Sequence, residues 1–357
     1  MERRNAWHEY TEEQLQEIDT LTTKYRHFLD HGKTERECVD QIVEAAEAAG
    51  YRNMDSVIKE GATLKAGDKV YYVHMKKAVA MVNIGTEPIE QGMNILGAHI
   101  DSPRLDVKQN PFYVDSDLAL LDTHYYGGIK KYQWVTMPLA IHGVVVKRDG
   151  TVINLAIGEN PTDPVFCVTD LLPHLGQEQM EKKAAKVVEG EQLDLLIGSR
   201  PVKGELKDGV KAYVLQVLQE QYDFEEEDFL SAELEIVPAG KARDMGFDRS
   251  MVMAYGQDDR VCAYTSLVAM LEVDNVKRTT CCLLVDKEEI GSVGATGMQS
   301  RFFENAVAEI LTLMGKPNSV SVRRTLEKSR MLSSDVSAGY DPLYASAYEK
   351  KNASYLG

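Results

Sequence analysis

The residues with the clearest chemical potential fall in two short segments that lie far apart in the chain. Residues 97–103 contain His99 and follow an apolar run, and residues 286–292 contain Glu288 and Glu289 and follow another apolar run. Each segment is typical of a buried strand that ends in groups able to bind a metal or move protons. Because ligands bind at the carboxyl ends of strands in open α/β sheets, we expect the two segments to form one active site.

A pair of catalytic metal ions needs oxygen donors, an imidazole nitrogen and one carboxylate able to bridge the ions. Residues of these types stand near expected strand or helix boundaries at four positions, namely His99, Asp258, Glu289 and Asp335. Asp101 lies two residues after His99, where its carboxylate could hold the far ring nitrogen and fix the tautomer. The sequence therefore predicts a metal site built from distant segments.

Glu288 precedes Glu289, so one carboxylate could bind metal while the other faces the water that the metal activates. Such a glutamate suits a general base, which accepts the proton of that water. Each motif alone has a simpler explanation: a polar histidine at a strand end, a solvated turn at 288–289, or a helix cap at Asp258. Their joint occurrence favours a metal-dependent hydrolase.

The elements that must position these residues begin with two helices within residues 11–50. Each has capping-box spacing at its start, Thr11 with Gln14 and Thr34 with Glu37. Segments rich in Val, Ile and Tyr then predict three strands, at Lys69–His74, Ala78–Ile84 and Met93–Ala98.

The final third of the chain returns to an alternation of helices and strands. Its pattern predicts a helix at Val261–Leu271, a strand at Thr279–Val285, a helix at Ser300–Leu313 and a short strand at Arg330–Asp335. Between these two regions the pattern is typical of β-hairpins, with turns predicted at Asp149-Gly150 and at Lys207–Gly209. Residues 174–197 are polar and predict a surface loop.

The simplest architecture is an α/β fold. We expect a mixed-sheet α/β domain formed by both ends of the chain, residues 1–106 and 246–357, with a β-rich domain inserted at 107–245.

The composition of the chain argues against several classes of function. The 357 residues carry a net charge of −16, which argues against binding to nucleic acid or to an anionic membrane. The sequence contains no apolar run of the roughly 20 residues that a transmembrane helix needs, and the start of the chain does not resemble a secretory signal. Five cysteines without a Cys-x-x-Cys pair predict neither a disulfide framework nor a thiolate zinc site. We expect a cytoplasmic protein.

Four ordered motifs give the chain a specific resemblance. These are residues 97–103, 257–260, 286–292 and 334–335, and together they resemble the aspartyl aminopeptidase family of zinc metallopeptidases from about residue 7 to the end. The resemblance implies an aminopeptidase that removes N-terminal residues from peptides with a free amino terminus. It also implies two zinc ions per complete subunit, although mixed nitrogen and oxygen ligands accept cobalt or manganese as well.

The resemblance also implies a role for each site residue. His99 and Asp335 would bind one zinc, with Asp101 orienting His99. Asp258 would bridge the two ions, Glu289 would bind the second, and Glu288 would be the general base. His142 is similar to a histidine that the family lends to a neighbouring subunit's active site, although a structural role is an equal alternative. Dimers formed through the inserted domain, and tetrahedral dodecamers, are the assemblies that the family implies.

One departure from the family concerns the second zinc, which the family completes with a histidine near the C-terminus of a longer chain. No histidine follows His174 in this sequence. We therefore expect a fragment of a longer enzyme or an incomplete second site, and little peptidase activity from this chain alone. The alternatives are a metal-dependent deacylase or carboxypeptidase-like hydrolase on the same scaffold, and a non-catalytic scaffold or binding subunit.

Overall fold

The computed structural model describes residues 4–204 and 207–356, whose contacts divide into two compact units. The first comprises the chain up to Ile100, Arg243–Asp286 and the residues from Gly294 onward. The second comprises Asp101–Ala242 and the short segment Lys287–Val293. The domain limits predicted from the sequence, at 106 and 245, fall a few residues beyond these divisions, and the predicted limit at 106 lies inside a strand.

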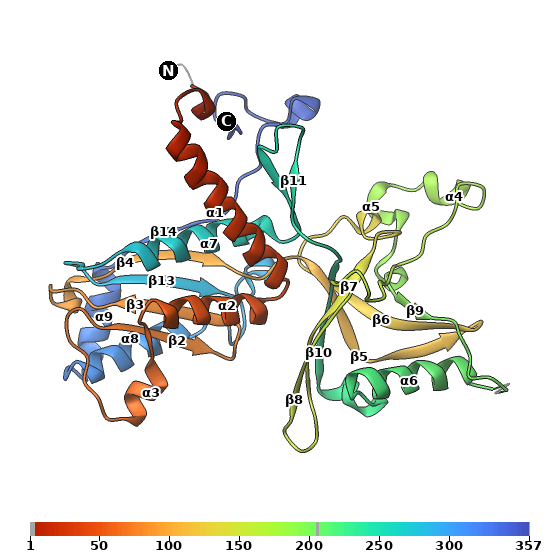
Figure 1. Cartoon of the computed structure of the whole chain (residues 1–357), viewed down its shortest axis with the longest axis horizontal. Helices are drawn as coiled ribbons and strands as arrows, with labels where there is room; N and C mark the ends of the chain where they lie inside the picture. The colour runs from red at the N-terminus through yellow and green to blue at the C-terminus, as the bar shows by residue number, and fades with distance from the viewer. Residues whose placement is uncertain (1–3, 205–206, 357) are drawn as a thin grey trace. The chain divides into compact units, whose positions relative to one another are not determined.

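The first unit is built on a mixed six-stranded sheet in the order β1-β2-β3-β13-β4-β14 (Figure 1). Strand β13 runs parallel to β4 and antiparallel to β3, and β14 is parallel to β4. This arrangement confirms the predicted α/β class with a mixed sheet. The strands are β1 (Arg52–Asn53), β2 (Lys69–His74), β3 (Ala78–Asn83), β4 (Asn94–His99), β13 (Thr280–Val285) and β14 (Arg330–Ser333).

Central strands β3 and β13 are continuous apolar runs because they are buried on both faces. Alternate residues of these strands, such as Ala80 and Leu283, form one core cluster with Phe302 and Ile310 of α8. Helix α2 contacts β3, and helix α7 contacts β13. The helices of this unit are α1 (Glu12–His31), α2 (Glu35–Ala48), α3 (Met54–Lys59), α7 (Gln257–Glu272), α8 (Phe302–Leu313) and α9 (Ser319–Lys328).

Both predicted capping boxes are formed, at Thr11 for α1 and at Thr34 for α2. The short elements of the first unit are the hairpin of β11 (Arg243–Met245) and β12 (Met251–Met253) and three 3-10 helices, η1 (Ala6–His8), η2 (Ile89–Gln91) and η7 (Pro342–Ala347).

The second unit is built on an antiparallel six-stranded sheet in the order β8-β7-β10-β5-β6-β9. The predicted hairpin turn at Asp149-Gly150 is confirmed, since it joins β7 to β8. The strands are β5 (Arg104–Asp115), β6 (Leu118–Tyr126), β7 (Leu139–Val146), β8 (Val152–Ile157), β9 (Leu195–Gly198) and β10 (Ala232–Pro238).

Two predictions for the second unit were wrong. The turn expected at Lys207–Gly209 is instead the start of helix α6 (Gly209–Tyr222), whose apolar residues pack against the sheet. Residues 174–197 are not one loop, because they form short elements with buried Leu193 and Leu195. Those elements are α4 (Gln177–Met180), α5 (Ala184–Val187), η4 (Gly190–Gln192) and the start of β9; η3 (Lys131–Gln133), η5 (Glu226–Ser231) and η6 (Glu288–Ile290) complete the unit.

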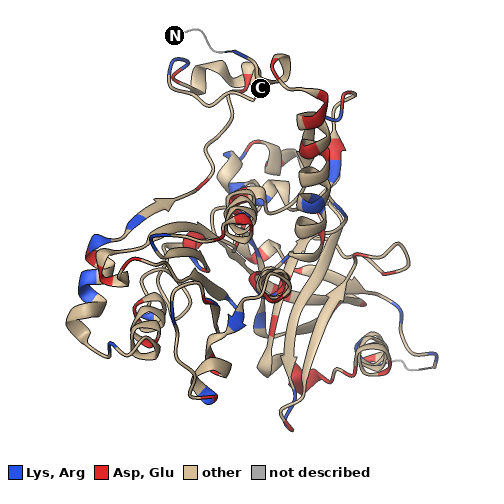
Figure 2. Ribbon diagram, turned by 60° about the vertical axis from the view of Figure 1, so that its left-hand side comes forward, with Lys and Arg blue, Asp and Glu red and all other residues tan. Residues whose placement is uncertain are grey.

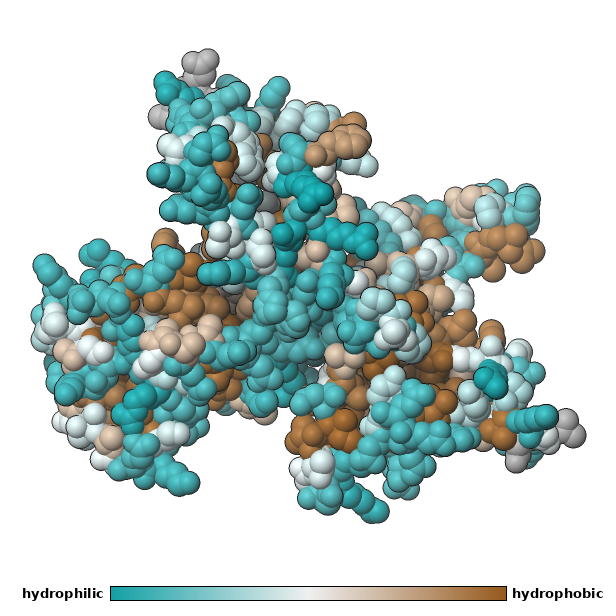
Figure 3. Space-filling model, in the orientation of Figure 1, coloured by the Kyte–Doolittle hydropathy of each residue, from teal (hydrophilic) through white to brown (hydrophobic). Residues whose placement is uncertain are grey.

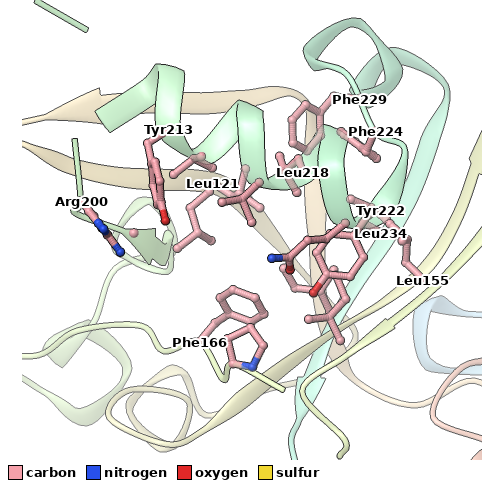
Figure 4. A pocket seen from close by; sticks show the side chains of 18 of the residues that line it. Leu121, Leu155, Phe166, Arg200, Tyr213, Leu218, Tyr222, Phe224, Phe229 and Leu234 are labelled. Carbon is pink, nitrogen blue, oxygen red and sulfur yellow. The ribbon is translucent and has the colours of Figure 1, made fainter. Parts of the chain in front are cut away.

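An apolar cavity of about 240 Å³ lies between α6 and the sheet of the second unit. Figure 4 shows side chains from both sides pointing into it, among them Leu218 of α6 and Leu121 of β6. The apolar side chains of α6 and of the sheet that line this cavity belong to the core of the second unit.

Charged residues are spread over the ribbon in Figure 2, with 56 acidic against 40 basic side chains in the sequence. The face seen in Figure 3 is largely hydrophilic with separate hydrophobic patches. Among the helices of residues 4–204 and 207–356, none is both long and apolar enough to cross a membrane.

Candidate metal centre

His99 is the last residue of β4, and its position follows from the register of the sheet. Strand β13 runs parallel beside β4 with Val285 opposite His99, so the two strands end at the same level. The His99 side chain is buried, with 3% of its surface exposed. The two strands that lead into the predicted motif segments therefore end side by side.

Two carboxylates of the first unit converge on the same imidazole nitrogen. His99 Nε2 lies 3.4 Å from Asp258 Oδ1, at the start of α7, and 3.9 Å from Asp335 Oδ1, just beyond β14. Two ligands that bind one zinc at about 2.1 Å in a tetrahedral arrangement lie about 3.4 Å apart. The three side chains thus have the atom types and spacing that suit a common divalent ion.

Asp259 belongs to the same cluster but has a different environment. Oxygens of Asp258, Asp259 and Asp335 lie within 4.8 Å of one another. The Asp259 side chain is fully buried, and burial raises its pKa to about 6, against the opposing effects of a hydrogen bond with Cys262 and of nearby His99. The peptide bond between Asp258 and Asp259 is cis.

In the second unit, Glu288 and Glu289 begin the short helix η6, and Asp101 holds their backbone. The Glu288 amide donates to Asp101 Oδ1 at 3.2 Å, and the Glu289 amide donates to Asp101 Oδ2 at 3.2 Å. The Tyr126 hydroxyl also donates to Asp101 Oδ2, at 2.7 Å. Asp101 is fully buried, so its carboxylate is a structural anchor of the loop that carries the two glutamates.

The remaining predicted residue, His142, lies in the middle of β7 and is 2% exposed. Its Nε2 lies 3.1 Å from Glu159 Oε1. Burial and pairing within its own unit favour the structural alternative that the sequence left open for this histidine.

Sequence reasoning missed a buried acidic cluster directly after β13. Thr296 donates to Asp286 Oδ2 at 2.5 Å, and Glu35 lies 3.5 Å from the Lys77 ammonium. Burial, followed by the Glu35 carboxylate, raises the pKa of Asp286 to about 7. Asp286 stood inside a predicted motif, but its neighbour Glu35 begins α2, far away in the chain, and one sequence carries no signal of such long-range pairing.

Sequence reasoning also missed Tyr126. It is one of 17 tyrosines and has no spacing that marks it, because its relation to Asp101 is created by the antiparallel sheet of the second unit.

A site with these donor types makes the chain a candidate metalloenzyme, and comparison with known proteins identifies the class. Residues 28–357 match the family described as aminopeptidase I zinc metalloprotease, M18. The chain belongs to this family of zinc metalloproteases.

Several relatives support the same assignment over the full chain. A probable M18 family aminopeptidase 1 of Clostridium acetobutylicum is 60% identical over 357 residues, which cover 100% of this chain and 77% of that protein. A protein of the same name from Borreliella afzelii is 43% identical over 361 residues, covering 100% of this chain and 78% of its own length.

Solved structures agree with the fold. The crystal structure of aminopeptidase I from C. acetobutylicum matches with a TM-score of 0.90 at 59% identity, over 100% of this chain and 77% of that one. The M18-family aminopeptidase of Thermotoga maritima matches with a TM-score of 0.92 at 43% identity, over the same shares. The predicted family, the fold class and the nature of the protein as an aminopeptidase are therefore confirmed.

Proposed function

We propose that this aminopeptidase uses His99, Asp258 and Asp335 as ligands of a zinc ion, and that Asp258 also faces a second ion bound by Glu289. The convergence of two carboxylates on His99 Nε2, at 3.4 and 3.9 Å, is the observation that carries this proposal. For Glu289, the support comes from chain connectivity, because it follows four residues after Val285, the strand residue paired with His99.

Bound zinc would supply Lewis-acid chemistry, lowering the pKa of a water and polarising the scissile carbonyl. Residues of the chain would then transfer the protons. Glu288, in the same short helix as Glu289, would accept a proton from the attacking water and return it to the nitrogen of the leaving peptide. Asp101 would keep both glutamates in place through their backbone amides.

Two measurements on the zinc-loaded protein test this function. We expect hydrolysis of peptides with a free amino terminus and no hydrolysis of the same peptides after N-acetylation. A deacylase or carboxypeptidase-like enzyme would show the reverse preference or none, and that result would contradict the proposal. Metal analysis tests the site itself, since zinc retained by the chain but lost from His99→Ala supports the assigned ligand.

We further propose that the second ion is held more weakly than the first. Asp258 and Glu289, the two donors assigned to it, are both carboxylates, whereas the first ion also has the imidazole of His99. Zinc binds less tightly to carboxylates alone than to a set that includes imidazole, so turnover should rise as zinc, cobalt or manganese is added. A titration that shows two equal tight sites, or robust turnover with one equivalent of metal, would contradict this.

Self-association is part of the same proposal. One solved relative of the fold is described as a yeast mApe1 dodecamer, with a TM-score of 0.74 at 18% identity. We propose dimers through the second unit and a tetrahedral dodecamer, which light scattering on the purified chain tests. A cytoplasmic location would suit the five free cysteines of the described residues.

A further inference from the structure

The carboxyl end of strand β6 reaches the loop of the two glutamates from inside the second unit. Its last residue, Tyr126, donates its hydroxyl to Asp101 Oδ2 at 2.7 Å. The same Asp101 oxygen accepts the amide of Glu289, and the other oxygen accepts the amide of Glu288. One buried carboxylate therefore links a strand end to the backbone of both glutamates.

The Tyr126 ring is itself held in place by its cross-strand neighbour. Arg104 of β5 pairs directly with Tyr126 in the antiparallel ladder, and its guanidinium carbon lies 3.9 Å from the centre of the ring. Arg104 Nε lies 2.7 Å from Asp106 Oδ1 and 3.3 Å from Glu235 Oε2. A guanidinium with two carboxylate partners keeps one orientation, so the tyrosine hydroxyl has a fixed direction.

The next residue, Gly127, provides a second and independent contact with the loop. Its φ of +75° is in the left-handed region, and a Cβ at this position would lie 3.2 Å from the Cβ of Glu289 and 3.4 Å from Cα of Pro103. Both distances leave little room for a side chain. The absence of a side chain at Gly127 therefore lets Glu289 lie against the end of β6.

We propose that Tyr126 and Gly127 are positioning residues of this aminopeptidase, which set the loop of Glu288 and Glu289 through Asp101 and through direct contact. The inference rests on the proposed roles of these glutamates and deepens them. The hydroxyl of Tyr126 selects the rotamer in which each Asp101 oxygen faces one amide. Without it, the carboxylate loses one donor and holds the two amides less firmly.

The decisive variant is Tyr126→Phe, which removes only the hydroxyl and keeps the ring under Arg104. Its matched control is Tyr125→Phe, since the neighbouring Tyr125 is exposed and stacks on His124. The first readout is amide hydrogen exchange of a peptide spanning residues 287–293 in the zinc-free full chain. Tyr126→Phe removes a hydrogen bond to a charged group. Amide exchange in residues 287–293 should therefore be on the order of 10-fold faster than in wild type, with no change in the control.

The second readout is kinetic and uses the zinc-loaded enzyme. We expect kcat to fall by about 10- to 100-fold, with KM within about 3-fold, because the two glutamates are proposed to act on the reacting atoms and not in binding the rest of the peptide. The melting temperature should stay close to that of the control. Unchanged exchange in 287–293 together with unchanged kcat would overturn the proposal, and so would equal effects from Tyr125→Phe.

Two further variants keep the test sharp. Gly127→Ala leaves the hydroxyl intact but presses on Glu289, so it should also speed exchange in 287–293; unaltered exchange would count against the direct contact. In an Asp101→Asn background, Tyr126→Phe should add little, because both act through one carboxylate. If exchange responds as expected while Glu288→Gln retains full turnover, the positioning role stands and the assigned base is wrong.

Discussion

Two sets of carboxylates, one in each unit, lie in opposite environments. In the first unit, Asp258 and Asp335 keep 58% and 52% of their side-chain surface exposed while pointing an oxygen toward buried His99. In the second unit, Asp101 is fully buried and accepts hydrogen bonds from the Tyr126 hydroxyl and from the amides of Glu288 and Glu289. Charged ligands that await a cation must remain accessible, whereas a buried carboxylate is stable only when donors surround it. The comparison separates the carboxylates proposed to bind a metal from a carboxylate that holds the backbone of a loop.

Glu288→Gln gives the largest expected effect. It tests whether the Glu288 side chain acts as the base while Asp101 holds only its backbone. The carboxamide cannot take a proton, so kcat should fall by about 10²- to 10⁴-fold. The bond from the Glu288 backbone to Asp101 is unaffected by the substitution, so zinc content and melting temperature should not change. Steady-state kinetics with metal analysis measure both. A near-normal rate would show that another group is the base.

His99→Ala tests the first unit, where we expect loss of metal instead of loss of structure. Zinc affinity should fall by more than about 100-fold, because even residues that only support a ligand contribute 10- to 100-fold. Competition with a zinc chelator measures it. His74→Ala is the matched control: His74 also ends a strand, but its Nε2 bonds the Ala295 carbonyl. Equal losses in the two variants would contradict the assignment of His99.

The parts of the fold that the sequence predicts well are those determined by local pattern. Strands β3 and β13 are apolar runs long enough to be read directly, and the boxes at Thr11 and Thr34 mark helix starts. Asp208-Gly209 misled the prediction, because Asp and Gly suit a hairpin turn as well as a helix start. The apolar face of α6 that decides between these has its partner elsewhere in the chain.

The site residues differ in the same way in how far the sequence predicts them. His99 and the pair Glu288 and Glu289 stand out because they end or follow strands, and the parallel neighbours β4 and β13 end at one sheet edge. Tyr126 and the partners of Asp286 do not stand out, since antiparallel pairing and packing of α2 against the sheet bring them in. Ligand types are visible in a sequence, but the groups that position them depend on the assembled fold.

Asp286→Asn tests whether the first unit also contains a buried carboxyl that destabilises it when charged. Its pKa is raised to about 7 in the folded chain, mainly by burial, against about 4 when unfolded. Between these values the folded chain binds the extra proton, so the free energy of unfolding falls as pH rises from about 4 to about 7. The zinc-free variant should be more stable than wild type by about 1–3 kcal/mol at pH 8, and nearly equal at pH 4.5.

Thermal or urea unfolding at the two pH values measures this difference. Glu44→Gln, on the exposed side of α2, is the control for removing a charge from the same unit. A stability gap between Asp286→Asn and wild type that stays constant with pH would rule out proton uptake at Asp286.

The smallest effects are expected at two helix starts, one in each unit. Thr34 accepts the Glu37 amide and Glu37 accepts the Thr34 amide, so Thr34→Ala should lower the free energy of unfolding by about 1 kcal/mol. Among the described residues, Asp208 makes no side-chain capping bond to α6 and has a φ of 55°. Asp208→Gly should therefore be neutral or slightly stabilising, because glycine adopts positive φ without strain. Urea unfolding distinguishes the two. Equal destabilisation would mean that Asp208 contributes a cap after all, and that the two helix starts do not differ as their hydrogen bonds indicate.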